Sequence, residues 1–461
     1  SEAMLELITP PLHGAQQSLE FLCDIHTYVY RNLGEEILWA TSMPCVLAGE
    51  TRIPIASYGS SHSGRMKHLY RVGLGYRYGR VMQVIAGVHY NYSLAESFWP
   101  LWADIKGQRQ RQQLINASYM GMVRNLQRYG WIIPSLFGAS PAVCKTFFGE
   151  RPASMPEFDE GTYYEPYATS LRMSDIGYQN QKEESVGIKA DYSSLESYID
   201  SLKCAIGTSS PVWEQIGLRD EHGDFRQLNT SILQIENEYY RCVRPKQVLR
   251  GMEKPTSALR DRGIRYVELR SLDVNAYEPQ GIDSQQLLFL EAFLLTCMFQ
   301  QSPPISSEER PEIDANLLLS ARRGREPQLK LRRGGADITL KSWGRELLGS
   351  MAAVCELLDA NHSGTPYEDS LRLQRARIED ADETPSARML AEMRDQGESF
   401  YHFARRKSVQ HSRYFKQRTI TEAVERRFIE EGEKSLLRQQ QREADDSGTF
   451  EQFLADYFAS Q

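Results

Sequence analysis

The chain has 461 residues, and 41% of them are hydrophobic, so it can bury one large core or two ordinary ones. Its formal net charge of −7 at pH 7 argues against general affinity for nucleic acid. No apolar run approaches the length of a membrane span and the start lacks the pattern of a signal peptide, so we expect a cytoplasmic protein without a membrane partner.

The first ten residues, SEAMLELITP, are predicted to form a β-strand. Met4, Glu6 and Ile8 share one face of it, and two leucines share the other. A carboxylate within an apolar strand is usually a solvent-facing residue, but Glu6 could also belong to a site. After a Pro-Pro break, apolar residues at helical spacing predict a helix over residues 15–33.

The segment YGSSHSGRMK, residues 58–67, looks at first like a phosphate-binding loop because its two glycines lie five residues apart. It is not a Walker A motif, since Arg65 and Met66 occupy the positions of the lysine and the Ser/Thr. A polar loop that leads into a helix over residues 68–76 is the favoured interpretation. Arg65 and Lys67 are weak candidates for a phosphate or nucleotide contact.

A strand is predicted from Val88 to Ser93, within RVMQVIAGVHYNYS. One valine and two tyrosines point to one face, and His89, Asn91 and Ser93 point to the other. This polar row is either an exposed outer face or the wall of a polar cavity, and taken alone it favours neither.

The middle of the chain carries polar residues among apolar ones. Amphipathic spacing predicts helices over residues 109–129 and 195–206. Between them, Arg172 lies between two apolar residues, so its guanidinium either snorkels to solvent or binds an anion. Residues 231–240, SILQIENEYY, are predicted to form a strand on which one glutamine and two glutamates share a face.

A second strand with polar residues is predicted over residues 264–275, IRYVELRSLDVN. One face is predicted to carry Tyr266, Glu268, Arg270 and Leu272, and the other Val267, Leu269 and Ser271. A carboxylate and a guanidinium at this spacing usually form a surface ion pair. If they face a cavity, they can hold a divalent cation and bind an oxyanion. Because two predicted strands carry polar residues of this kind, we favour a functional site on one face of a sheet.

The last third of the chain changes character. Asp283 is predicted to cap an apolar core helix over residues 287–299. Residues 303–336 are predicted to be rich in loops, with a basic cluster that is either a solvated face or a loop on the phosphate side of a site. From about residue 341 the chain is predicted to be helical and highly charged.

These patterns predict an α+β fold in which a largely antiparallel sheet cups the active site, with helices outside it and at the C-terminus. We expect a catalytic domain over residues 1–340 and a helical part over residues 341–461 packed on it. The seven cysteines are scattered and form no CxxC, which predicts reduced thiols and neither disulfides nor a zinc site. GxGxxG, GxSxG and HExxH are absent from the sequence.

The sequence resembles the glutamate–cysteine ligases of the proteobacterial type. The matching stretches lie between the first residues and about residue 300: LELITP, SMPC, YGSSHSGRMKHLYRVGL, MQVIAGVHYNYSL, RYGWIIPSLFGASPA, YATSLRMSDIGY, LQIENEYY with RPK, and YVELRSLDVN. The resemblance implies a glutamine-synthetase-like fold. It also implies that ATP is used to join the γ-carboxyl of glutamate to the amino group of cysteine.

The resemblance implies roles for individual residues. Glu6, His89 and Glu268 are expected to bind magnesium, or manganese, and Glu268 and Arg270 to be catalytic, with Arg270 at the transferring phosphoryl group. Arg172 is expected to hold the α-carboxylate of glutamate. The expected cysteine-binding residues are Tyr70, Leu74, Gln83, Tyr178 and Tyr240.

The family also has an upstream segment with a Glu-x-Glu metal motif, which this sequence does not contain. We expect the full protein to have it. Two alternatives stand beside the ligase: a related γ-glutamyl ligase with another amine acceptor, and an inactive binding protein on the same fold.

Overall fold

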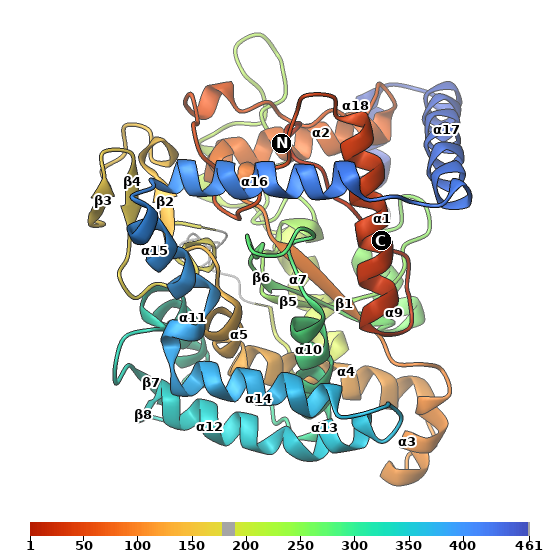
Figure 1. Cartoon of the computed structure of the whole chain (residues 1–461). Helices are drawn as coiled ribbons and strands as arrows, with labels where there is room; N and C mark the ends of the chain where they lie inside the picture. The colour runs from red at the N-terminus through yellow and green to blue at the C-terminus, as the bar shows by residue number, and fades with distance from the viewer. Residues whose placement is uncertain (178–189, 460–461) are drawn as a thin grey trace.

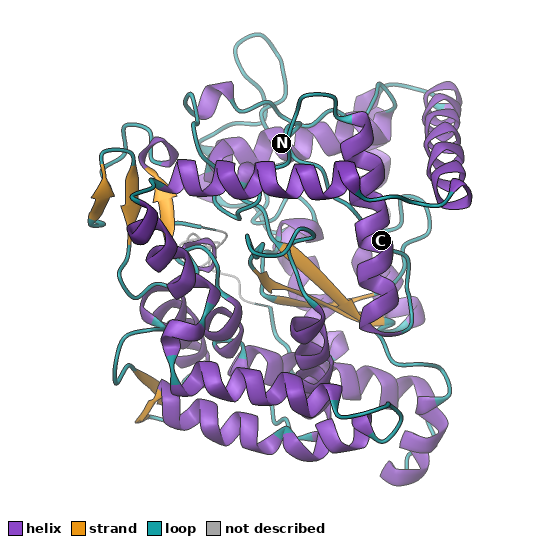
Figure 2. Ribbon diagram, viewed as in Figure 1, coloured by secondary structure: helices purple, strands orange, loops and turns teal. Residues whose placement is uncertain are grey.

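The computed structural model describes residues 1–177 and 190–459 (Figure 1). Helices dominate this part of the chain, and its strands form small antiparallel sheets (Figure 2). The predicted α+β class with antiparallel pairing is therefore confirmed.

The helices up to residue 262 are α1 (Gly14–Asn32), α2 (His62–Tyr78), α3 (Phe98–Lys106), α4 (Arg111–Tyr129), α5 (Ile132–Phe137), α7 (Leu195–Gly207), α8 (Pro211–Glu214) and α9 (Pro255–Arg262). The later helices are α10 (Ser284–Phe299), α11 (Glu309–Arg323), α12 (Leu340–Ser350), α13 (Ala352–Asp359), α14 (Pro366–Glu379), α15 (Pro385–Gln396), α16 (Phe400–Gln417), α17 (Glu422–Asp445) and α18 (Phe450–Ala459). Short 3₁₀ helices are η1 (Glu50–Arg52), η2 (Arg80–Val84), η3 (Lys145–Phe147), η4 (Leu171–Met173), η5 (Glu236–Glu238) and η6 (Ala381–Glu383). The strands are β1 (Val88–Tyr92), β2 (Ala142–Cys144), β3 (Glu157–Asp159), β4 (Thr162–Tyr164), β5 (Val243–Lys246), β6 (Tyr266–Leu272), β7 (Lys330–Arg333) and β8 (Ala336–Thr339).

The sheet at the centre of the molecule has the strand order β1-β6-β5 (Figure 1). Glu268 in the middle strand lies opposite Asn91 on one side and Arg244 on the other. Because residues in register project to the same face, these three side chains share one surface of the sheet. The alternation predicted for β1 is thus present, and it places the polar row of β1 on the face of Glu268. In β6 a bulge between Leu269 and Leu272 interrupts the alternation, so Leu272 lies in the hydrophobic core and not on the predicted polar face.

The other face of the sheet belongs to the main hydrophobic core. Tyr90 and Tyr92 of β1 pack against this core, as the predicted alternation requires. The apolar helix α10 packs between α4 and α14. Asp283 caps α10 through a capping box, in which its carboxylate accepts from the N–H of Gln286 and the side chain of Gln286 accepts from the N–H of Asp283.

The C-terminal helices surround the N-terminal part of the chain. α16 packs on α1. Below the central sheet in Figure 1, α12 and α13 follow one another end to end, and α14 lies alongside both. Trp343 and Leu371 belong to the same buried cluster as residues of α4 and α10. Buried residues on both sides of position 340 therefore share one core, and the division at 340 stays a prediction.

Four secondary-structure predictions are wrong. Residues 62–67 belong to α2 and not to the polar loop predicted before it, because Ser61 caps the helix there by accepting from the N–H of Gly64. The first ten residues form no strand, and Leu5 and Ile8 are exposed, because no described strand pairs with this segment. Residues 231–240 form η5 and turns, since their glutamine and glutamates bond locally. Residues 309–323 form the helix α11 within a region predicted to be rich in loops.

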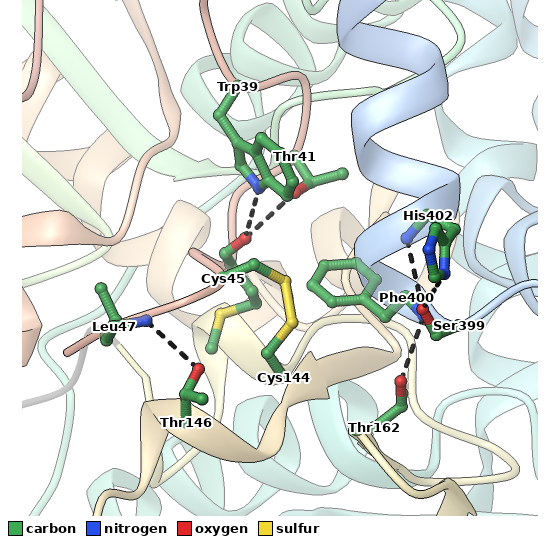
Figure 3. The surroundings of a disulfide bond; sticks show 12 residues. Trp39, Thr41, Cys45, Leu47, Cys144, Thr146, Thr162, Ser399, Phe400 and His402 are labelled. Carbon is green, nitrogen blue, oxygen red and sulfur yellow. Dashed lines mark hydrogen bonds between the residues drawn. A yellow bond between two sulfur atoms is a disulfide. The ribbon is translucent and has the colours of Figure 1, made fainter. Parts of the chain in front are cut away.

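The prediction of reduced thiols is wrong for two cysteines. Cys45 and Cys144 form a disulfide, with their Cα atoms 5.3 Å apart (Figure 3). They are separated by 99 residues, so no local spacing signals the pair. The other five cysteines are free. The disulfide joins the loop before η1 to the end of β2, and Leu47 beside it donates its N–H to the hydroxyl of Thr146.

Within residues 1–177 and 190–459, no helix has the length and apolar character needed to span a bilayer.

Candidate functional site

Polar side chains from all three strands of the central sheet surround the carboxylate of Glu268. Arg270 Nη1 donates to Glu268 Oε1 over 3.0 Å, and His89 Nδ1 lies 3.7 Å from the same oxygen. On the other side, Lys246 Nζ lies 3.7 Å from Glu268 Oε2. Glu268 is buried, whereas His89 and Lys246 are partly exposed. The structure thus brings together three residues predicted from sequence and adds Lys246.

A bulge in β6 lies opposite His89. The pairing of β1 with β6 shifts between Val88 and Tyr90: His89 alone lies opposite both Arg270 and Ser271, so the extra residue of the bulge is on β6. A bulge re-aims a side chain and raises the local twist, and bulges are common beside functional sites. Here it leaves the imidazole facing Glu268 while the neighbouring tyrosine stays in the core.

Burial and neighbouring charges set the protonation of this cluster. Burial, and then the charge of Arg270, lower the pKa of His89 to about 3, so the imidazole is neutral at physiological pH. Burial alone would raise the pKa of Glu268, but Arg270 and Lys246 outweigh it and lower that pKa, so the group is a carboxylate. Burial lowers the pKa of Lys246 against the attraction of Glu268.

A neutral imidazole and an ionised carboxylate that lie side by side can both act as ligands of a divalent cation. Glu268 Oε2 is buried and accepts no hydrogen bond, so a lone pair remains for a ligand. Magnesium commonly takes one or two protein carboxylates and completes its shell with water and substrate phosphates. The part of the chain that the structure describes contains no preformed group of three or more His, Cys, Asp or Glu for a metal. Glu6 lies on the exposed N-terminal segment, and its metal role stays a prediction.

Arg172 is almost fully buried and contacts the backbone of Arg270. Its Nη2 donates to the carbonyl of Arg270 over 2.8 Å, and its Nη1 lies 3.7 Å from Asp273 Oδ1. Asp273 also accepts from the hydroxyls of Ser140 and Ser170. A Cβ at Gly87 would lie 2.1 Å from Arg172 Nη2, so only glycine leaves room for this guanidinium. The fold therefore fixes Arg172 firmly beside the cluster.

The residues predicted to bind cysteine lie on three segments. The hydroxyls of Tyr70 and Tyr240 lie 3.4 Å apart, and burial raises the pKa of Tyr70 well above its usual value. Leu74 lies one turn after Tyr70 on α2 and is buried. Gln83, in η2, donates to the carbonyl of Arg71. Tyr178 lies outside the described residues, and the cysteine-binding role of the whole set stays a prediction.

The two weak phosphate candidates make aromatic contacts. The guanidinium of Arg65 stacks over Phe450 of α18 at 4.2 Å, and Lys67 Nζ lies 5.8 Å from the ring centroid of Tyr58. A cavity of about 630 Å³ lies between the start of α2 and the start of α18, lined by His62, Asp446 and Phe453 among others. None of the predicted site residues lines it.

A buried ion pair that was not predicted from the sequence fixes the segments of Tyr70 and Tyr240 against each other. Arg77 of α2 and Glu238 of η5 are fully buried and joined at 2.8 Å, and Tyr78 donates to the same carboxylate oxygen. Gln234 donates its N–H to the other oxygen. Arg77 lies seven residues after Tyr70, and Glu238 lies two before Tyr240, so the pair fixes one segment against the other. The glutamates of 231–240 were visible in sequence, but their partner on α2 was not.

Comparisons with known proteins agree on one family. Residues 1–319 match the family model described as glutamate–cysteine ligase. A protein from Pseudomonas entomophila named glutamate–cysteine ligase is 44% identical over 461 residues, which cover 100% of this chain and 86% of the relative. One from Pseudomonas aeruginosa is 45% identical, over 100% of this chain and 87% of the relative.

Solved structures support the same assignment. A Francisella tularensis glutamate–cysteine ligase in complex with AMP superposes with a TM-score of 0.91 at 33% identity, covering 98% of this chain and 88% of the other. A bifunctional glutathione synthetase from Pasteurella multocida superposes with a TM-score of 0.66 at 23% identity, covering 89% of this chain and 47% of the other, which indicates a shared fold.

Proposed function

The chain belongs to the glutamate–cysteine ligase family, and on that premise we propose how its residues join the γ-carboxyl of glutamate to the amino group of cysteine at the expense of ATP. This reaction is the first step of glutathione synthesis. The observation that carries the proposal is the cluster of His89, Glu268 and Arg270 on one face of the central sheet. Its substrates are glutamate, cysteine and ATP, and we place the enzyme in the cytoplasm.

The chemistry requires activation of a carboxylate. The γ-carboxylate oxygen of glutamate attacks the γ-phosphorus of ATP, which releases ADP and leaves an acyl phosphate. The neutral amine of cysteine then attacks the acyl carbon, inorganic phosphate leaves, and the amine nitrogen loses a proton. Neither step needs a covalent nucleophile from the enzyme, in keeping with a sequence that has no such motif.

The charge of each residue suits it to a different part of the substrates. Glu268 and His89, with Glu6, would hold Mg²⁺ or Mn²⁺, which when bound offsets the charge on the phosphate and carboxylate oxygens. Arg270 contacts the equatorial oxygens of the transferring phosphoryl group and stabilises the charge that spreads over them. Arg172 binds the α-carboxylate of glutamate. Tyr70, Leu74, Gln83, Tyr178 and Tyr240 surround the cysteine, with hydroxyls for its polar groups and rings around its thiol.

An isotope experiment tests this function. Glutamate labelled with ¹⁸O in its γ-carboxyl is incubated with ATP, Mg²⁺ and cysteine, and the inorganic phosphate is analysed by mass spectrometry. We expect one ¹⁸O in each phosphate released, because the carboxylate oxygen leaves with the phosphoryl group. Unlabelled phosphate, or no glutamate-dependent ADP, would contradict the proposal. Replacing cysteine with 2-aminobutyrate in the same assay measures the selectivity for the acceptor.

A further inference from the structure

Lys246 is the last residue of β5 and lies beside the active-site carboxylate. Its backbone carbonyl accepts from the N–H of Arg265, so the pairing of β5 with β6 fixes its position. Its ammonium lies 3.7 Å from Glu268 Oε2, which is longer than a hydrogen bond, and its side chain is 28% exposed. The lysine therefore reaches the candidate cation site with its charged end still accessible.

The ammonium of Lys246 has fewer acceptors from the protein than the guanidinium of its neighbour Arg244. Arg244, on the same strand, donates to the carbonyls of Asn237 and Tyr239. Among the described residues, the ammonium of Lys246 makes one ion pair, with Glu268. One carboxylate oxygen satisfies at most one of the three N–H donors of a mostly buried ammonium, so a further acceptor would stabilise it.

The geometry around Glu268 indicates the charge of that acceptor. Arg270 approaches Oε1 and Lys246 approaches Oε2, so the carboxylate has a cationic group on each side. A divalent cation on Oε2 would stand next to the ammonium and repel it. An anion that contacts both the cation and the ammonium removes that repulsion, and a phosphoryl group offers several oxygens for this purpose.

We infer that Lys246 is a phosphate-binding residue of this active site, whose ammonium donates to a non-bridging oxygen of the phosphoryl group that passes from ATP to glutamate. The inference rests on the proposed function, since it takes ATP to be the phosphoryl donor. Lys246 and Arg270 then hold the transferring group from opposite sides of Glu268.

Nucleotide binding tests the inference independently of turnover. Isothermal titration calorimetry with Mg²⁺ measures the affinity of wild type and Lys246→Met for the β,γ-imido analogue of ATP and for ADP. A charge-assisted hydrogen bond is worth roughly 1.5–3 kcal/mol, so we expect Lys246→Met to weaken binding of the analogue by about tenfold to a hundredfold. Binding of ADP, which lacks the transferring group, should change less than about twofold.

Lys145→Met is the matched control, because Lys145 is 25% exposed and pairs with Glu157 on another sheet. It should leave both affinities unchanged. Equal loss of analogue and ADP in Lys246→Met, or no loss of either, would overturn the inference. If the wild type makes no ADP with glutamate, the proposed function fails, while the difference between analogue and ADP still decides the role of Lys246.

Discussion

Glu268 accepts a hydrogen bond from Arg270 at one oxygen, and its other oxygen is buried next to Lys246. Glu268→Gln keeps the volume and removes the charge, so it should preserve the fold and weaken any cation bound there. We expect turnover to fall by at least roughly a hundredfold. Steady-state ADP release measures this, with circular dichroism as the check on folding.

Glu291→Gln is the control for that substitution. Glu291 of α10 accepts hydrogen bonds from Tyr92 and Tyr367, so it is another partly buried carboxylate with a structural role. Its variant should keep turnover within a few-fold of wild type. Near-normal activity of Glu268→Gln would contradict the metal role of Glu268.

Tyr240 presents its hydroxyl to that of Tyr70 at the end of the segment braced by Glu238. Tyr240→Phe removes the hydroxyl and keeps the ring, so a hydrogen bond to cysteine would be lost while the wall of the pocket remains. We expect the KM for cysteine to rise about threefold to tenfold, in line with one hydrogen bond. The KM for ATP should stay constant, and an equal rise in both would argue against a cysteine pocket at this position.

At the level of elements, β1 and β6 could be predicted because their polar and apolar residues alternate over most of each strand, and a strand period of two assigns side chains to faces. The bulge that turns Leu272 into the core could not be predicted, because it depends on the pairing with β1. The sequence also indicated that His89, Glu268 and Arg270 belong to one site. It could not place Lys246 beside them, because the register of β5 with β6 depends on pairing between distant segments. Residues 231–240 were mispredicted for a related reason, since Glu238 turns toward Arg77 on α2.

The contact between α1 and α16 predicts a pH dependence of stability. The ring of His26 stacks on Phe415, and His411 donates to the carbonyl of Ala276. Burial lowers the pKa of both histidines below the usual value. Below pH 6.5 the unfolded chain therefore takes up protons that the folded chain does not, so the free energy of unfolding falls as the pH decreases. The slope is at most about 1.4 kcal/mol per pH unit for each histidine.

Urea unfolding at pH 7.5 and pH 5.5 checks this dependence. His26→Phe keeps an aromatic ring against Phe415 and removes one titrating group, so its free energy of unfolding should fall less between the two pH values than that of wild type. Comparing each protein with itself cancels the change in stability that the substitution causes at neutral pH. An identical fall in both proteins would show that His26 does not contribute.

At the scale of the whole molecule, the chain is held by contacts between segments far apart in sequence. One buried cluster joins α1, α4, the central sheet, α10 and the helices α12 to α14. A second joins the loop around Met43 to β2 and to α15 and α16. The apolar periodicity of the helices could be predicted, but their partners could not, because periodicity marks a buried face without indicating what covers it. The disulfide between Cys45 and Cys144 lies within this second cluster.

Because that disulfide closes a long loop across 99 residues, it should stabilise the fold chiefly by restricting the unfolded chain. We expect Cys144→Ser to lower the free energy of unfolding by about 2–4 kcal/mol in urea without reductant. Cys204→Ser, at an exposed free thiol, is the matched control and should change it by less than about 0.5 kcal/mol. Thiol titration in denaturant should give five groups before reduction and seven after it, in accordance with one disulfide and five free cysteines. Seven thiols before reduction, or equal stability of the two variants, would contradict a stabilising bridge between the loop before η1 and β2.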